Sequence, residues 1–469
     1  MFVGSDSVQN QELAEYAISV ADRLGFEYSE AYLENSYGRA YAVQQGELNA
    51  SVYIEKAGLR IRLIKDGKLY TFSTNKFDRN TISRAISRYK GFVGTSVHLS
   101  DEKPEKARYS VSEKKKIDSA DALKDLLDLD KTLSENKYIK YRSLYASVER
   151  SRTLFINSQG ARVESNTPSV GSVMSIIVKS RNETRQRILQ FGGVGGYELL
   201  NMGQIEEQVL DEASALVNVI NKGVSLSSYE LSKIKNVVIA PEISGIAVHE
   251  SVGHPNEADR VFLREAAQAG TSYLTKDNIG MRIGSYGVTI IDDPTIKNSN
   301  GFYLYDDEGV KARPKTIVDN GRQNELLTNR EYAYTLGGKS NASARSDSYS
   351  NEPIVRMSNT YLKPGDASLD ELVSEANDGV YIKSFMEWNI DDTRSFSRYQ
   401  GSEAYLIRNH RLGKPVKNYK LETKTIDFWH AVKLLSKELE LYVATCGKGE
   451  PEQGVPVTMG GPSALLSFG

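Results

Sequence analysis

The segment Pro241–Arg260, PEISGIAVHESVGHPNEADR, constrains the fold more than any other part of the chain. It contains two of the five histidines, His249 and His254, and Glu250 directly follows the first. Neutral imidazoles bind zinc, and a carboxylate beside them can accept the proton of a bound water. We therefore interpret the segment as a candidate metal site, for which the fold must bring both imidazoles to one point.

The spacing of the two histidines does not fit a regular α-helix. Histidines in the HExxH arrangement lie four residues apart and about 40° apart around the helix. Here they are five residues apart, so a regular helix turns by roughly 500° and separates them by about 140°. Two deviations would bring them together: a π-bulge, or a helix that ends at Gly253 and turns His254 back. Because Gly253 and Pro255 both break helices, the sequence favours the second.

A catalytic zinc site uses three protein ligands and keeps a position for water, so one further ligand is required. Cys446 is a candidate because it opens CGKGEPEQG, a glycine-rich turn that can bring a thiolate close to another backbone. His98, His410, His430 and many carboxylates are alternatives. Residue chemistry alone prefers the cysteine only modestly, since a lone cysteine is usually a small buried hydrophobe.

Composition limits the class of protein. A chain of 469 residues is too long for one hydrophobic core and predicts two or three domains. The formal net charge of −2 gives no basic surface, so we expect no nucleic-acid partner. No apolar run is long enough to span a bilayer, and the start MFVGSDSVQN lacks the regions of a signal peptide. With a single cysteine, these features predict a cytoplasmic protein without a membrane contact.

The succession of patterns predicts an α+β fold. Amino-terminal mixed helix/strand units precede a large, mostly antiparallel β-rich carboxyl-terminal domain that carries the HExxxH helix. The segment DEKPEKARYSVSEKKK is charged and contains a proline, which is typical of a linker. The predicted boundaries are 1–100 for an amino-terminal α+β unit, 101–117 for the charged linker, 118–230 for a middle α+β unit and 231–469 for the β-rich domain.

Local patterns predict the elements of the first two units. The expected helices are 7–24, 78–89 with Asp78 as its cap, 119–133 and 203–221. The expected strands are 31–33, 39–43, 59–64, 69–72, 143–149, 153–156 and 173–178, with turns at Gly38, Gly46, Asp66-Gly67 and the glycine cluster 191–198.

In the third unit a strand at 237–240 is expected to lead into the motif helix. Asn256 with Asp259 forms a capping pair for a helix through Ala269. Short strands and turns follow, interrupted by two expected helices, 368–376 and about 427–441.

Several sequence strings together resemble the TldD/PmbA family of metallopeptidases, and most closely its TldD-type, metal-bearing branch. Each string is short, but they follow one another in order over about half of the chain. The strings are HESVGH at 249–254 with the following NEAD, DDEG at 306–309, RMSNTYLKPG at 356–365, SEAYLIRN at 402–409 with PVKN at 415–418, and CGKGEPEQGVPVTMGGP at 446–462.

The resemblance implies a zinc-dependent peptidase that hydrolyses peptides or unfolded polypeptide segments. Carried onto this chain, His249, His254 and Cys446 are the ligands of a zinc ion, and Glu250 is the general base that accepts the proton of the zinc-activated water. It also implies a dimer, with itself or with a PmbA-like (TldE-type) subunit. Pro255-Asn256 replaces the glycine-rich continuation that is usual in the common bacterial pattern, which leaves the substrate preference open.

Two other functions agree less well with the sequence than a peptidase does. The alternative within the family is a catalytically inert, peptide-binding partner subunit of a TldD/PmbA-type dimer, in which a ligand or the glutamate would be substituted; none is. A structural zinc site in a nucleic-acid-associated protein conflicts with the near-neutral charge. Arg260, His410 and His430 are candidates for stabilising the developing oxyanion, and no pattern favours any of them.

Overall fold

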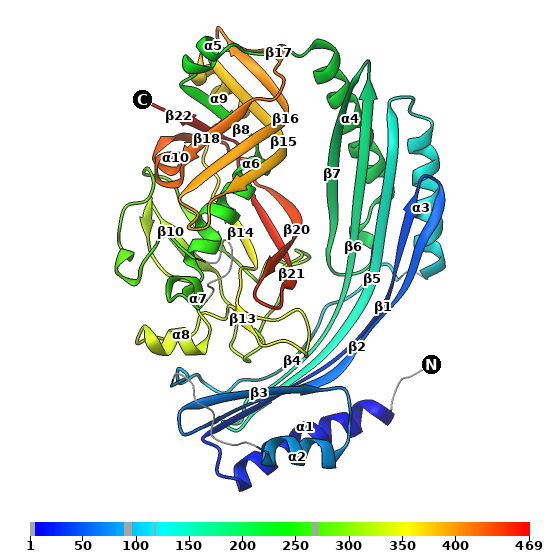
Figure 1. Ribbon diagram of the computed structural model, residues 1–469, viewed down its shortest axis with the longest axis vertical. Coiled ribbons are helices and arrows are strands. Elements are labelled where there is room, and N and C mark those ends of the chain that lie inside the picture. The colour runs from blue at the N-terminus through cyan, green and yellow to red at the C-terminus, as the bar shows by residue number, and fades with distance from the viewer. Residues whose placement is uncertain (1–4, 89–95, 117–118, 265–270) are drawn as a thin grey trace.

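The computed structural model describes residues 5–88, 96–116, 119–264 and 271–469. Figure 1 shows a long, curved sheet beside a β-rich body that contains the carboxyl-terminal half of the chain. The fold is α+β and β-rich, as the sequence predicts. No helix among the described residues is long and apolar enough to cross a membrane.

The long sheet has seven strands in the order β3-β2-β1-β5-β6-β4, with β7 also paired to β6. Among the described residues of this sheet, β4 and β6 form the one parallel pair, and all other neighbouring strands are antiparallel. The sheet draws strands from both predicted amino-terminal units, so these units share one sheet. Its strands are β1 Tyr28–Gln44, β2 Glu47–Lys65, β3 Lys68–Thr74, β4 Lys106–Ser110, β5 Ile139–Asn157, β6 Arg162–Ser180 and β7 Glu183–Val194.

Four helices cover this sheet. Figure 1 shows α1 Ser5–Arg23 and α2 Arg79–Ser87 at its lower end, while α3 Ser119–Ser134 and α4 Met202–Lys222 lie along its upper half. The carboxylate of Asp78 accepts from the Thr81 N–H at 2.7 Å and caps α2, as predicted. Each pair of helices buries its apolar side against the sheet, which gives this part of the molecule two separate hydrophobic cores.

The strands are longer than the sequence predicts. The segments 31–33 and 39–43 belong to the single strand β1, and 143–149 and 153–156 belong to β5. Gly38, expected as a turn, lies inside β1, where a Cβ atom would stand 2.1 Å from the Val148 carbonyl oxygen. Glycine at this position therefore allows a close approach of two strands rather than a turn.

The predicted linker is also partly wrong. Residues 106–110 form β4, which pairs in parallel with residues 162–166 of β6. In the glycine cluster 191–198, β7 continues to Val194 and the 3-10 helix η1, Tyr197–Leu199, follows, so the cluster is not simply a turn. The predicted domain boundaries themselves stay a prediction.

The carboxyl-terminal body contains two large sheets. One has the order β11-β10-β9-β14-β21-β20, the other β17-β16-β15-β8-β22-β19 with β18 paired to β16. One pair in each runs parallel, β14 with β21 and β15 with β8, so the described sheets are mostly antiparallel, as predicted. Their strands are β8 Asn236–Ile239, β9 Ile290–Asp292, β10 Lys315–Asp319, β11 Arg322–Gln323, β14 Asn359–Leu362, β15 Gly379–Ile390, β16 Phe396–Arg408, β17 Arg411–Pro415, β18 Lys420–Lys424, β19 Val432–Leu435, β20 Glu440–Lys448, β21 Gln453–Gly461 and β22 Ala464–Ser467.

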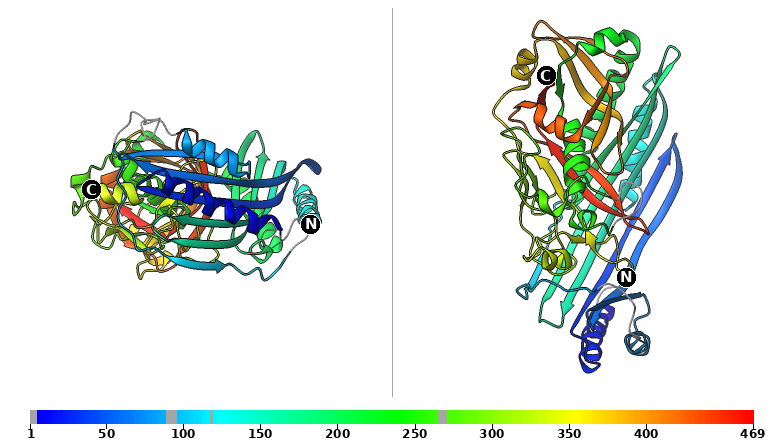
Figure 2. Two further views of the ribbon diagram at one scale, coloured as in Figure 1. Left: turned by 90° about the horizontal axis from the view of Figure 1, so that it is seen from below. Right: turned by 60° about the vertical axis from the view of Figure 1, so that its left-hand side comes forward.

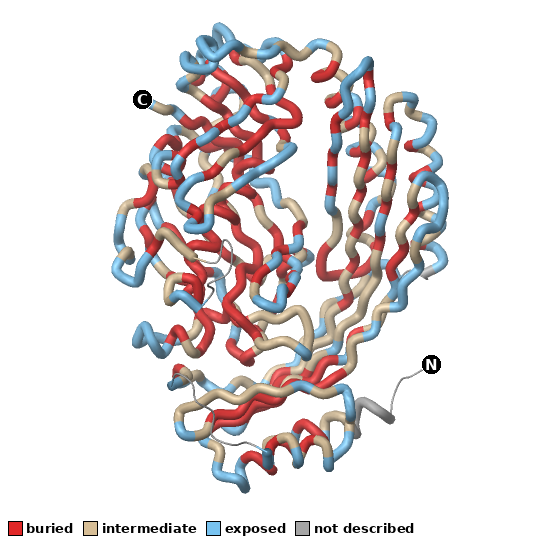
Figure 3. The backbone as a smooth tube through the Cα atoms, viewed as in Figure 1, coloured by how far each residue is buried: buried red, intermediate tan, exposed pale blue. Residues whose placement is uncertain are grey.

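The motif helix α6, Pro241–Val248, packs against strands of both sheets, namely β14, β20, β21 and β15. Every residue of α6 is buried, and Figure 3 shows this buried core at the centre of the body. Figure 2 shows the long strands of the first sheet running alongside this body. The remaining elements of the body are α5 Ser228–Ser232, α7 Ala258–Val261, η4 Lys276–Asn278, α8 Arg330–Thr335, β12 Ala344–Arg345, β13 Ile354–Val355, α9 Leu369–Ala376 and α10 Thr425–Ala431.

Two predicted helices of this body are wrong in extent. The helix expected through Ala269 is only α7, because Leu263 has a φ of 62° and ends the helical path; residues 265–270 lie outside the described residues. The helix expected over 427–441 ends with α10 at Ala431, since the next residues pair with β22 as β19. The capping box at Ser368 is confirmed.

Candidate metal centre

The motif helix changes its winding at the first histidine. After α6, residues His249–Gly253 form the π-helical turn η2, and His254–Asn256 form the 3-10 helix η3. The His254 N–H donates to the His249 carbonyl, which is the i to i+5 bond of a π-turn. Gly253 keeps helical angles, with φ −56°, so the predicted break there is wrong. The π-bulge, which the sequence did not favour, aligns the histidines.

Side chains stabilise this wider turn. Pro255 has no N–H to donate, so carbonyls of the preceding turn need other partners. The Tyr273 hydroxyl donates to the Ser251 carbonyl at 3.1 Å, and the Asn256 amide donates to the Val252 carbonyl at 2.8 Å. Side chains outside the helical hydrogen-bond pattern thus bind the carbonyl groups of the π-turn. Asn256 stabilises this turn, and the prediction that it caps a later helix is wrong.

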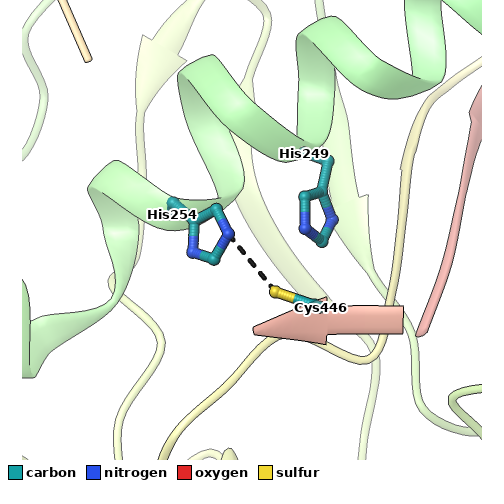
Figure 4. A group of neighbouring side chains, drawn as sticks. All are labelled: His249, His254 and Cys446. Carbon is teal, nitrogen blue, oxygen red and sulfur yellow. Dashed lines mark hydrogen bonds between the residues drawn. The ribbon is translucent and has the colours of Figure 1, made fainter. Parts of the chain in front are cut away.

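The three predicted ligands lie together (Figure 4). The rings of His249 and His254 have centroids 4.8 Å apart at an interplanar angle of 81°. His254 Nε2 lies 3.3 Å from Cys446 Sγ, and the candidate ligand atoms of all three residues lie within 4.8 Å of one another. Each residue is no more than 5% exposed. The alternatives His98, His410 and His430 are exposed and lie outside this group.

Cys446 lies on a strand rather than in the glycine-rich turn that follows it. It belongs to β20, where it is paired opposite Val455 of β21. Arg356, from the RMSNTYLKPG string, donates to the Cys446 carbonyl and, at 2.9 Å, to the Gln453 carbonyl. The guanidinium therefore joins both strands of the hairpin at the level of the thiol.

Glu257 lies behind His254. Its Oε2 is 2.9 Å from His254 Nδ1, 2.7 Å from Arg260 Nε and 3.2 Å from Lys448 Nζ. The same ammonium group lies 2.6 Å from Asp259 Oδ1. The carboxylate at Nδ1 holds a proton on that nitrogen and orients the ring with Nε2 toward the thiol. Arg260, a predicted oxyanion candidate, pairs with this carboxylate instead.

Electrostatics favour the ligand forms of these groups. Burial lowers the pKa of His249, which favours the neutral imidazole. Burial would raise the pKa of Cys446, but the charge and hydrogen bond of His254 outweigh it and lower this pKa below its usual value. Burial would also raise the pKa of Glu257, but Lys448 and His254 hold it well below the usual range.

The residues present fit a metal ion. Within the described ranges, no group forms a hydrogen bond with Nδ1 of the buried His249, and an unsatisfied buried polar atom is costly. Two imidazoles and a thiolate form a donor set that zinc takes in proteins. The bond to Glu257 supplies the outer carboxylate that usually orients a ligating histidine.

Glu250 lies in the same turn, and its carboxylate is paired with Arg394 Nη1. The same nitrogen lies 3.3 Å from the Glu250 carbonyl oxygen. Burial would raise the pKa of Glu250, but the adjacent rings of His254 and His249 and the paired Arg394 guanidinium outweigh it and lower this pKa below its usual value. Sequence reasoning missed Arg394, because a single arginine in the polar turn 391–395 carries no motif.

This buried group of two imidazoles and a thiol, with a carboxylate in the same turn, defines the class: a candidate metallohydrolase centre. Family models of PmbA/TldA metallopeptidases match the chain in three consecutive parts. Domain 1 matches residues 29–88, the central domain 109–217 and the C-terminal domain 232–468. The chain belongs to the PmbA/TldD family of metallopeptidases.

Curated relatives agree with this assignment. A metalloprotease of Methanothermobacter thermautotrophicus is 28% identical over 463 residues, which is 98% of this chain and 98% of that protein. A zinc metalloprotease TldD homolog of Saccharolobus solfataricus is 35% identical over 227 residues, 48% of each chain. The solved structure of TldE from Thermococcus kodakarensis has a TM-score of 0.75 at 16% identity and covers 97% of this chain and 98% of its own. That structural likeness shows the fold alone.

Proposed function

We propose that this chain is a zinc-dependent peptidase that hydrolyses peptides or unfolded polypeptide segments. The observation that carries the proposal is that Cys446 of β20 meets His249 and His254 at the π-turn, which also bears Glu250. These three residues would hold the zinc ion. When bound, zinc lowers the pKa of a water molecule toward neutrality and polarises a carbonyl group.

The roles of the chain's own residues follow from their contacts. A carboxylate of Glu250 accepts the proton of the attacking water and then delivers it to the leaving amine as the C–N bond breaks. A carboxylate is ionised at neutral pH, and so able to accept that proton. Glu257 orients His254 through Nδ1. Lys448 connects the strand of Cys446 to the acids that follow the motif helix.

The proposed partner is a second subunit, either another copy of this chain or a PmbA-like chain of the TldE type. The support is family membership and the shared fold of the TldE structure. A cytoplasmic location is proposed from the single cysteine of the sequence. The inert-subunit alternative gains no support, since this chain retains the three ligand residues and the glutamate in one site.

Glu250→Gln tests the function. Unstructured casein and short fluorogenic peptides serve as substrates, with zinc quantified in the same preparations. We expect a loss of cleavage of roughly 10²–10⁴-fold, typical of a removed general base, while zinc content stays at the wild-type level. Glu422→Gln, on the exposed face of β18, is the matched control and should cleave normally. Cleavage by Glu250→Gln at the wild-type rate would exclude Glu250 as the base.

A further inference from the structure

Arg394 is a buried cation that contacts the proposed base twice. Its Nη1 donates to Oε2 of the Glu250 carboxylate and, at 3.3 Å, to the Glu250 backbone carbonyl. Arg394 is 6% exposed and Glu250 is 8% exposed. A pair this deeply buried is only weakly screened by salt. The guanidinium thus binds both the side chain and the π-turn that carries it.

The turn around Arg394 is built to hold one conformation. Arg394 has a φ of 62°, a left-handed angle that is uncommon for residues other than glycine. The Asp391 carboxylate accepts from Thr393 Oγ1 at 2.5 Å, from Ser395 Oγ at 2.9 Å and from the Phe396 N–H at 2.7 Å. This turn joins β15 to β16, so its conformation is anchored in the sheet.

A second element fixes the same residue. The Thr425 hydroxyl, at the start of α10, donates to the Arg394 carbonyl at 2.7 Å. This angle is therefore enforced from two sides, by Asp391 within the turn and by Thr425 from outside it. These contacts hold the backbone that carries the guanidinium in one place.

We propose that Arg394 is the positioning residue of Glu250. The inference rests on the proposed function and deepens it. Because Arg394 donates to Oε2, it orients the carboxylate and leaves Oε1 to accept the proton of the attacking water. Because it also binds the backbone carbonyl of Glu250, it holds the base in place against the turn that carries His249 and His254.

Arg394→Gly is the sharpest variant. Glycine accepts the positive φ, so this change removes the guanidinium without adding backbone strain. We expect kcat to fall roughly 10- to 100-fold, the range of a lost charge-assisted hydrogen bond, with KM within about threefold of wild type. Zinc content should not change, because the arginine acts on the base and not on the ligands. Arg398→Ala is the control and should leave kcat unchanged, because this half-buried arginine of β16 pairs with Glu387 and not with Glu250.

Three further measurements separate positioning from mere stabilisation. Millimolar guanidinium should restore part of the kcat of Arg394→Gly, and equal urea or sodium chloride should not. Arg394→Lys should retain intermediate activity, because one ammonium group cannot reproduce the guanidinium fork. Thr425→Val keeps the guanidinium but frees its backbone, and should lower kcat less than Arg394→Gly. If Arg394→Gly does not fold, a lowered kcat of Thr425→Val at unchanged zinc content tests the same role of Arg394.

The outcomes are distinct. An unchanged kcat in Arg394→Gly, or a loss of thermal stability alone, overturns the inference. A raised kcat also overturns it and shows that Arg394 restrains the base. If wild type cleaves peptides and Glu250→Gln does not, while Arg394→Gly is fully active, only this inference fails. If Glu250→Gln cleaves as wild type does, the proposed function and this inference fail together.

Discussion

Glu257→Gln removes a negative charge on which three donors converge. Oε2 of Glu257 lies within 3.2 Å of His254 Nδ1, Arg260 Nε and Lys448 Nζ. The amide keeps the volume and one neutral acceptor. A hydrogen bond to a charged group contributes roughly 1.5–3 kcal/mol and a neutral one roughly 0.5–1.5 kcal/mol, so each bond loses about 1 kcal/mol.

The three losses together predict that the metal-free protein is destabilised by about 3 kcal/mol, within the range for breaking a buried ion pair. The loss at His254 acts on the metal as well. Removing the carboxylate that orients a ligating histidine weakens metal affinity roughly 10- to 100-fold, which is about 1.4–2.7 kcal/mol. Both effects come from one atom, Oε2 of Glu257, but they are measured in different states of the protein.

The assay is zinc competition with a chromophoric chelator, together with urea unfolding of the metal-free protein. Glu331→Gln is the control, since Glu331 pairs with Arg264 at 3.4 Å and does not contact a candidate ligand. It should leave zinc affinity unchanged. If Glu257→Gln binds zinc as tightly as wild type, Glu257 does not orient His254, even if the variant is less stable.

Two further predictions follow from single groups. Cys446 is the only cysteine of the chain, so a thiol reagent reports on this one site. We expect slow modification of the thiol in the zinc-loaded protein and faster modification after chelation. Equal rates in the two states would count against zinc ligation by Cys446. Asp292 is fully buried, and although burial would raise its pKa, Lys315 at 2.8 Å lowers it below the usual value. The pKa of Asp292 in the folded protein is thus below its unfolded value of about 3.9. The charged Asp292 therefore stabilises the fold above about pH 3.9, and this contribution is lost as the pH falls through the folded pKa. The difference in unfolding free energy between wild type and Asp292→Asn should therefore be large at pH 7 and shrink in acid; a constant difference would contradict the assigned charge.

The grouping of His249, His254 and Cys446 was predictable because it depends on residue type. Five histidines and a single cysteine are few enough in this sequence to stand out. The exact winding of the helix was not predictable, since Gly253 and Pro255 favour a break in isolation. The π-turn is stabilised by Tyr273 and by the side chain of Asn256, and the contact of Tyr273 exists only in the folded protein.

Local signals predicted the caps at Asp78 and Ser368, but they failed for the cap expected at Asn256 and for the strand lengths. Asp78 and Ser368 cap helices because each contact lies within three residues along the chain. Gly38 was misinterpreted as a turn because its role depends on the backbone of β5, over a hundred residues away. The segment after Ala431 has a helical pattern, but pairing with the last strand of the chain overrides it. Arg394 carries no sequence signal, because its partner Glu250 is distant in the chain.

X-ray absorption at the zinc edge tests the central claim most directly, because it identifies the donor atoms of the bound metal. The account predicts one sulfur at about 2.3 Å and two imidazole nitrogens at about 2.0–2.1 Å, completed by one oxygen. In Cys446→Ser the sulfur contribution should disappear. A zinc spectrum of the wild type without sulfur, or one that Cys446→Ser does not alter, would contradict a centre formed by His249, His254 and Cys446.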